Sequence, residues 1–260
     1  MTTPPTGPQE GRATDPAGWA APVQDLGEKE LPPGAESLNI EGRPTASLGS
    51  GFGQEWRKTY RLRFPESEPS PGEVIAAWKE DFDSFWPEGN RFWRPRRGII
   101  PGEVGAAELS MPGGVKIATG LYVLYADDES FTLETAQGHM FAGWITFSAS
   151  LEEGRTVAQA QTTMRANDPL YEAGLMLGGH AKEDRFWAQT LTALAGHFGA
   201  AARVENSTEL LNGRRQWRKA TNIWWNASLR TTAHRLLTPA RAALQRLRAP
   251  DSKRRGRGTR

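Results

Sequence analysis

The stretch from residue 167 to 199 constrains the fold most, because it predicts a long helix with one wide apolar side. Asn-Asp-Pro at 167–169 suits a helix start, Gly199 suits a helix end, and Gly-Gly at 178–179 predicts a break between them. Such an apolar side needs a partner surface of similar size. After the break, its residues recur at helical spacing: Phe186, Trp187, Leu191, Leu194, Ala195 and Phe198.

Strand-like segments directly before this helix offer that partner surface. Their connections are short, so they should form an antiparallel meander. The predicted fold class is therefore α+β, with a curved antiparallel sheet gripping the long helix in a domain that spans residues 51–204. Alternation and turn residues place the five strands at 103–111, 115–126, 130–135, 140–150 and 156–166.

The chain before the meander adds one strand and one helix. Alternating polar and apolar residues over 55–64 predict a half-buried strand. Ser70 to Glu73 match a capping box, which predicts a helix that ends at Pro87. Residues 87–102 are rich in proline, glycine and arginine, and we expect a loop there, with a short second helix as the alternative.

This order of elements carries a resemblance to a known superfamily. The segment at 131–172, FTLETAQGHMFAGWITFSASLEEGRTVAQAQTTMRANDPLYE, is continued at 183–199 by EDRFWAQTLTALAGHFG. Both resemble the START-like helix-grip superfamily, in particular its SRPBCC-type members from actinobacteria, with polyketide cyclase/dehydrase and lipid-transport relatives. The resemblance implies an antiparallel sheet that grips the final helix, with a cavity between them for an apolar ligand.

The strands and the first helical turns supply side chains for the wall of such a cavity. The alternative is that these side chains fill a dry core. The break at 178–179 would let residues 170–177 act as a lid over the open end of the sheet. The candidate ligand-binding residues are Leu121, Val123, Tyr125, Phe131, Leu133, His139, Phe141, Ile145, Phe147, Met164, Tyr171 and Leu175.

A catalytic site is the competing hypothesis. His139 could do acid–base work with the carboxylates of Asp168 and Glu172. Nothing in the spacing brings these groups within reach of one another, and a turn residue, a helix cap and a first-turn residue explain all three. Glu183-Asp184 suits a solvated helix face, and no histidine spacing indicates a metal site. We therefore predict no catalytic residue, no metal and no cofactor.

The two ends of the chain differ from its body. Residues 1–50 hold 8 prolines and 7 glycines without a repeat, which predicts a disordered arm. Residues 213–260 hold 14 lysines and arginines and one acid, a net charge of +13, against 18 basic and 29 acidic residues, −11, elsewhere. The absence of cysteine excludes disulfides and thiol catalysis, and no apolar leader or spanning run is visible. These features predict a cytoplasmic protein, with peripheral association at a membrane as an alternative.

The basic tail is the second functional element. Residues 205–249 predict a basic amphipathic helical extension, which Thr238-Pro239 breaks and recaps, and residues 250–260 predict a disordered basic end. Such a helix can lie on an anionic membrane or bind nucleic-acid phosphates, or its apolar stripe can dock on the body of the protein. The candidate membrane or polyanion contacts are Arg214, Arg215, Arg218, Lys219, Trp224, Trp225, Lys253, Arg254 and Arg255.

These observations predict that the protein binds a hydrophobic small molecule or lipid between sheet and helix, without covalent chemistry. The first alternative is a polyketide cyclase/dehydratase-type enzyme that uses the same cavity. The second is a peripheral membrane or nucleic-acid adaptor that acts through the basic tail. The identity of the ligand and the oligomeric state stay open.

Overall fold

The protein is described by a computed structural model that covers residues 15–27, 31, 33–66, 68–111 and 114–248, with side chains as far as Thr238. Within these residues one eight-stranded sheet runs in the order β2-β3-β4-β5-β6-β7-β1-β8. Every pair of neighbouring strands is antiparallel. The strands are β1 Glu55–Arg63, β2 Arg91–Trp93, β3 Val104–Ser110, β4 Lys116–Ala126, β5 Ser130–Thr135, β6 Phe141–Glu152, β7 Arg155–Ala166 and β8 Val204–Asn212.

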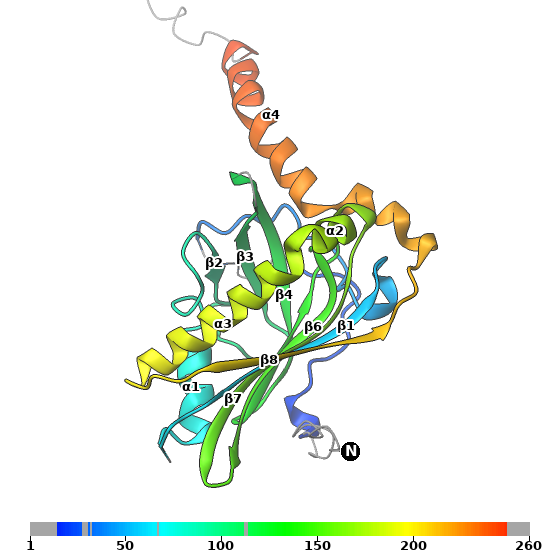
Figure 1. The fold of residues 1–260 in the computed structure, drawn as a ribbon. Helices are drawn as coiled ribbons and strands as arrows, with labels where there is room; N and C mark the ends of the chain where they lie inside the picture. The colour runs from blue at the N-terminus through cyan, green and yellow to red at the C-terminus, as the bar shows by residue number, and fades with distance from the viewer. Residues whose placement is uncertain (1–14, 28–30, 32, 67, 112–113, 249–260) are drawn as a thin grey trace, which may run out of the picture.

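One long helix crosses the sheet, and we call the face that it covers the inner face (Figure 1). Leu191 and Leu194 of this helix are fully buried against the sheet. A curved antiparallel sheet that grips a long helix is a helix-grip fold, so the predicted fold class is confirmed. The helical elements are η1 Pro16–Gly18, η2 Leu48–Ser50, α1 Pro71–Glu80, α2 Pro169–Gly174, the π-helical turn η4 Leu175–Gly179, the gripping helix α3 His180–His197, η5 Trp217–Trp225 and α4 Ala227–Arg248.

The predicted helix over 167–199 is present as α2, η4 and α3, with the expected break. The Asp168 carboxylate accepts hydrogen bonds from the backbone N–H groups of Leu170 and Tyr171, which makes it the N-cap. Leu177 and Gly178 leave the helical conformation, and Gly178 has a φ of +107°. This conformation favours glycine, because a Cβ would clash there with the backbone.

The five strands of the meander also lie where the alternation predicts them, as β3 to β7. Residues 112–113 of the first predicted hairpin lie outside the described residues. A β-bulge between Val123 and Tyr125 shifts the register of β4 against β5. A bulge moves the following side chains to the other face of the sheet, and this has consequences for the predicted cavity wall.

Three predictions outside the meander were wrong. The first helix ends at Glu80 rather than Pro87, because the chain turns at Asp81 and buries Phe82 in that turn. The expected loop or helix at 87–102 contains the short strand β2. Residues 205–212, expected in the helical extension, belong to β8, which pairs with β1 but exposes nearly all its side chains. A strand without a buried face lacks the alternation that would reveal it.

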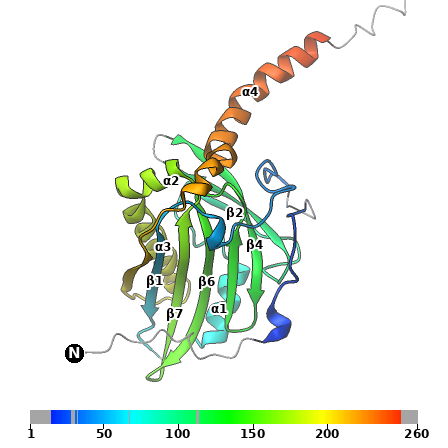
Figure 2. The same ribbon diagram turned by 90° about the vertical axis from the view of Figure 1, so that its right-hand side faces the viewer.

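The described part of the predicted disordered arm, within residues 15–50, packs on the outer face of the sheet. Leu26, Ile40 and Ala46 are at least 98% buried. Leu26 and Ile40 join a second core cluster with Tyr122 and Ala136 of the sheet, and Figure 2 shows the blue N-terminal segment running beside β4. The composition indicated disorder because these apolar anchors follow neither a helical nor a strand period. Each anchor packs on the sheet by itself. Residues 1–14 lie outside the described residues.

The basic extension differs from the predicted helix in two further respects. Residues 217–225 form the 3₁₀ helix η5, and α4 begins only at Ala227. α4 also continues through Thr238-Pro239, where we expected a break. A proline removes one backbone donor from a helix, and the Thr238 hydroxyl, next to it, donates a hydrogen bond to the His234 carbonyl. The predicted basic end at 250–260, with Lys253, Arg254 and Arg255, lies outside the described residues.

Candidate functional site between the sheet and the gripping helix

Aromatic rings fill the inner face at the end of the sheet near α1. Phe131 and Phe147, on neighbouring strands, stack with ring centroids 4.7 Å apart. Trp78 and Phe82 meet the Phe147 ring edge-on at 4.9 and 5.1 Å, and Trp187 of α3 meets it at 5.5 Å. We call these five residues the aromatic cluster. It is a packed core and leaves no room for a ligand among its rings.

Ten of the twelve predicted wall residues are buried or partly buried in three places. Leu121, Val123, Phe131, Leu133, Ile145 and Phe147 lie in the inner core with α3. Phe141, Tyr171 and Leu175 join a separate cluster where α2 meets the sheet. Met164 of β7 is buried and lies opposite Trp56 of the neighbouring strand β1.

Two predicted wall residues lie elsewhere. Tyr125 follows the β4 bulge, and its ring packs against Trp19 of the N-terminal segment at 5.0 Å, on the outer side of the sheet. His139 lies in the β5–β6 turn, where its Nδ1 accepts a hydrogen bond from the Phe141 backbone N–H at 3.0 Å. Burial lowers the pKa of His139 to about 4, so the imidazole is neutral at ordinary pH.

A buried charged cluster lies on the inner face between β1 and the first turn of α3. Lys58 is 1% exposed, and its Nζ lies 2.8 Å from Asp184 Oδ1 and 3.1 Å from Glu183 Oε2. The same Nζ donates a hydrogen bond to the His180 carbonyl, and the Tyr60 hydroxyl donates one to Asp184 Oδ1 at 2.8 Å. We call Lys58, Tyr60, His180, Glu183 and Asp184 the Lys58 cluster. A buried lysine requires such partners, because an isolated charge would be strongly destabilising.

The environment of this cluster shifts its proton affinities. Burial raises the pKa of Glu183 to about 7, although the nearby Lys58 ammonium opposes the shift. Burial and the two carboxylates raise the pKa of Tyr60 far above its usual range. Burial and Lys58 lower the pKa of His180. Near neutral pH the Glu183 carboxyl is therefore poised to hold or release a proton.

One polar atom of this cluster, His180 Nδ1, lacks a hydrogen-bond partner among the described residues. Glu183 Oε2 has the Lys58 ammonium as its partner at 3.1 Å. The Thr119 hydroxyl, on β4, is buried and unpaired in the same way. Buried polar atoms are normally hydrogen-bonded, so such atoms indicate a place where water or a ligand group binds.

The inner face continues from the Lys58 cluster across the neighbouring strands. The strand register places Lys58, Thr162 and Ile145 in one row across β1, β7 and β6. Ile145 is 8% exposed and Leu121 is 7% exposed, although both lie on the inner face, whereas Phe147 is 0% exposed.

The two carboxylates of the catalytic hypothesis, Asp168 and Glu172, have structural roles. The Asp168 carboxylate, besides capping α2, accepts a hydrogen bond from the Asn226 amide at 2.8 Å. Glu172 is ion-paired with Arg215 of the basic tail at 2.8 Å. No hydrogen bond joins His139 to either carboxylate among the described residues. Asp168 and Glu172 therefore bind residues of the tail and hold it on the body of the protein.

Sequence reasoning missed the Lys58 cluster, although a signal was present. Lys58 stands between Trp56 and Tyr60 at the same alternating positions as the apolar face of β1. A lysine on a buried strand face predicts an acidic partner from the element that covers it. Glu183 was that partner, and the expectation of a solvated Glu183-Asp184 pair was wrong for Glu183, which is 8% exposed.

The described part of the chain has no metal centre of the usual kind and shows a hollow on its surface. No group of three or more histidine, aspartate or glutamate side chains is arranged to hold a metal ion there. A surface hollow of about 500 Å³ lies at the base of α4, away from the inner face. Its lining residues are Ala35, Glu36, Ser37, Leu38, Glu41 and His234.

Comparisons with known proteins find similar structures only. No protein-family model and no curated protein matches the sequence. A START superfamily protein from Mycobacterium smegmatis is 20% identical, with a TM-score of 0.37 over 56% of this chain and 97% of that one. Protein Ms6760 from the same organism is 13% identical, with a TM-score of 0.42 over 59% of this chain and 94% of that one.

A third similar structure is the di-domain ARO/CYC StfQ from the steffimycin biosynthetic pathway. It is 10% identical, with a TM-score of 0.43 over 55% of this chain and 50% of that one. Likenesses of this size carry no functional argument, and the function has to be argued from the residues of this chain.

Proposed function

We propose that the protein binds a hydrophobic small molecule or lipid between the inner face and α3, without covalent chemistry. The observation that carries the proposal is the Lys58 cluster, a buried ion pair with an unpaired His180 Nδ1, on the same inner face as Ile145 and Leu121. A mainly apolar site with a few fixed polar groups is the usual form of a small-molecule site.

The composition of the site suggests what the ligand looks like. Ile145 and Leu121 would contact an apolar body. Glu183, at a pKa of about 7, would offer a carboxyl group that can donate or accept a hydrogen bond near neutral pH. The preferred ligand is therefore an apolar molecule with one hydroxyl or carbonyl group, held with that group toward Glu183.

The lid hypothesis remains part of this proposal. η4 lies directly before the Lys58 cluster, and its Met176 and Leu177 are 68% and 87% exposed. A π-helical turn with a glycine at positive φ is a place where a helix can bend. We propose that bending at Gly178 admits the ligand.

Native mass spectrometry of protein purified from its source cells tests the proposal. The expected result is a co-purifying apolar molecule, which organic extraction removes and which rebinds to the stripped protein. A protein that carries no such molecule, and takes none from a lipid extract of the same cells, would contradict it.

A second candidate function is a cyclase/dehydratase-type enzyme, favoured by one observation. Glu183 combines burial with a pKa of about 7, and general acids and bases work best near the operating pH. The two candidates separate in the Glu183→Gln variant. An enzyme would lose turnover of an aromatic-polyketide substrate while keeping its affinity, whereas a binding protein shows no turnover in either form.

We place this function in the cytoplasm, which suits a chain without cysteines. Among the described residues, no helix combines the length and the apolar character that crossing a bilayer requires.

A further inference from the structure

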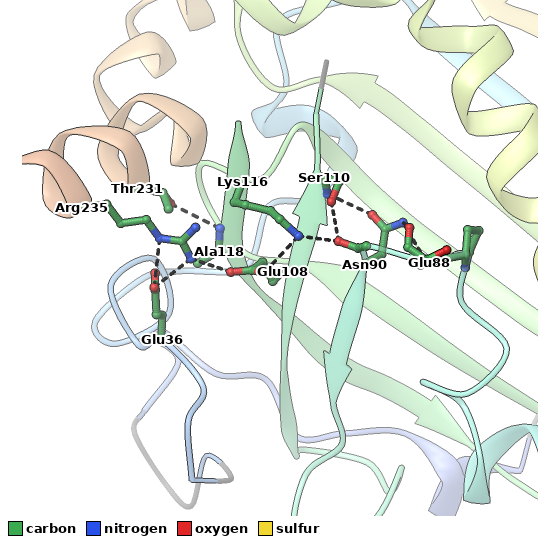
Figure 3. Close-up of polar contacts among 11 residues, drawn as sticks. Glu36, Glu88, Asn90, Glu108, Ser110, Lys116, Ala118, Thr231 and Arg235 are labelled. Carbon is green, nitrogen blue, oxygen red and sulfur yellow. Dashed lines mark hydrogen bonds and ion pairs between the residues drawn. The ribbon is translucent and has the colours of Figure 1, made fainter. Parts of the chain in front are cut away.

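The helix α4 docks on the body through its polar side. Thr231 is fully buried, and its hydroxyl accepts a hydrogen bond from the Ala118 N–H. Arg235 forms ion pairs with Glu36 and with Glu108 (Figure 3). Residues 231 and 235 are one helical turn apart, so one side of α4 makes these contacts.

The apolar stripe of α4 faces away from the body. Leu229 and Leu236 are 48% and 73% exposed. Leu229 lies on the side opposite Thr231, because residues two apart on an α-helix differ by about 200°, and Leu236 lies close to the line of Leu229, seven residues further on. The docking that the sequence offered as an alternative therefore occurs with the opposite orientation: the polar side is buried and the apolar stripe is free of partners among the described residues.

The 3₁₀ helix η5 is docked in the same orientation, with polar contacts to the body and apolar side chains outward. The Asn222 amide donates hydrogen bonds into the body, to the carbonyls of Ser50 and Asn167. Trp217 and Trp224 point outward and are 73% and 78% exposed. Solvent contact of two tryptophans is unfavourable in water, so their exposure indicates a partner surface.

The exposed tryptophans adjoin η4. The Arg215 guanidinium joins the two segments, because it is ion-paired with Glu172 and lies 3.4 Å from the sulfur of Met176. Trp225 is different from the other two tryptophans, since the Arg43 guanidinium covers its ring at 4.4 Å. The exposed apolar side chains of this region are Leu170, Met176, Leu177, Trp217, Trp224 and Leu229.

Basic side chains lie among these apolar ones. Arg214, Arg218 and Lys219 form no ion pair with any described residue. Together with the six apolar residues they make up what we call the basic tryptophan surface. Tryptophan is favoured at the membrane–water interface, and basic residues are attracted to the negative surface potential of anionic lipids.

We propose that the basic tryptophan surface docks on an anionic lipid bilayer, with Trp217 and Trp224 at the headgroup level. Charge alone would equally suit nucleic-acid phosphates. The apolar side chains decide between the two, because Leu177 and Met176 would gain nothing from a phosphate backbone but would be removed from water in a bilayer interface.

Vesicle sedimentation with the full-length protein tests this proposal. Vesicles of phosphatidylcholine with about one-third phosphatidylserine should bind the protein, and neutral phosphatidylcholine vesicles should bind it at least about 10-fold more weakly. Raising salt from about 0.05 M to about 0.5 M should release most of the bound protein.

Two variants locate the interaction. Arg214→Ala/Arg218→Ala/Lys219→Ala should weaken vesicle binding about 100-fold, because three favourable charges are lost. The matched control is Arg96→Ala/Arg155→Ala/Arg203→Ala, which removes the same charge from exposed sites elsewhere and should bind like the wild type.

Trp217→Ala/Trp224→Ala should weaken binding at least about 10-fold and leave the salt dependence in place. Thermal melting shows whether each variant folds. If the tryptophan variant melts early through loss of the Phe52 contact, the charge variant decides alone.

Three results would overturn the proposal. They are equal binding by the charge variant and its control, equal binding to neutral and anionic vesicles, and duplex DNA that binds more tightly than anionic vesicles at the same salt.

Discussion

The two ends of the inner face belong to one sheet and are covered by the same helix, yet they differ in chemistry. Near α1, Phe131 and Phe147 stack and are fully buried. Near the start of α3, Lys58 and Glu183 are buried as an ion pair. The aromatic cluster closes one end of the grip as a hydrophobic core would. The Lys58 cluster has the features of a binding site.

The two ends stabilise the fold by different means. Close ring packing stabilises the fold through contact, whereas a buried ion pair must offset the loss of water around its charges. Substitutions at the two ends should therefore act on different measured quantities.

The largest expected effect is at the aromatic cluster. Trp78→Ala should lower the free energy of unfolding by about 3–5 kcal/mol, because a fully buried ring is lost and a cavity remains. Chemical denaturation measures this loss. Leu151→Ala, at an exposed position of β6, is the control and should change stability by less than about 0.5 kcal/mol. A loss below about 1 kcal/mol for Trp78→Ala would show that this end is not a packed core.

The Lys58 cluster should make the free energy of unfolding depend on pH. Folding raises the pKa of Glu183 from 4.5 to about 7, so between these values the folded protein holds a proton that the unfolded chain releases. The wild type should lose up to about 3 kcal/mol of stability on this account as pH rises through that window. Glu183→Gln cannot titrate, so its stability relative to the wild type should rise from pH 4.5 to 7. Parallel pH profiles of the two proteins would be incompatible with a buried, titrating Glu183.

His139, outside both clusters, should produce the opposite slope. Its pKa falls from 6.5 to about 4 on folding, so the stability that the neutral ring contributes is present above pH 6.5 and is lost as pH falls toward 4. The change is up to about 3 kcal/mol. His139→Gln should therefore gain stability relative to the wild type on acidification. Denaturation of both proteins at a series of pH values checks this, and no relative gain would contradict a buried neutral His139.

The smallest expected effect is at the helix break. Gly178→Ala should cost about 1–2 kcal/mol, because φ at this residue is +107°. Gly174→Ala is the matched control: Gly174 has a helical φ of −62° and open space around its Cβ position, so alanine should be neutral or stabilising. Thermal melting of the pair measures the difference. Equal melting temperatures would mean that the break relaxes to regular helix when glycine is replaced.

The sequence predicted the parts of this fold that repeat with a period. β3 to β7 carry alternating apolar residues and α3 buries a stripe, so their alternation and helical spacing are visible in the residues. β8 was missed because backbone pairing with β1 holds it while its side chains stay exposed. The N-terminal segment was missed because Leu26 and Ile40 anchor it singly.

The candidate site was predicted only in its apolar part. The positions of Val123, Ile145 and Phe147 follow from alternation, but a single-residue bulge placed Tyr125 on the opposite face, and no pattern announces a bulge. Lys58 and Glu183 are separated by more than a hundred residues, so only the packing of α3 on β1 brings them together. The sequence could show that Lys58 was out of place, but not which carboxylate faced it.

The central claim is that a ligand binds beside Ile145 rather than in the aromatic cluster. A fluorescence titration with anilinonaphthalene sulfonate, an aromatic probe with an anionic group, tests it most directly. Ile145→Trp should fill the space and weaken probe binding at least about 10-fold. Leu151→Trp, at an exposed position of the same strand, should bind like the wild type, and Trp217→Ala/Trp224→Ala should show that the probe does not report on the tail. Unchanged binding by a folded Ile145→Trp protein, or binding lost only with the tail tryptophans, would contradict the account.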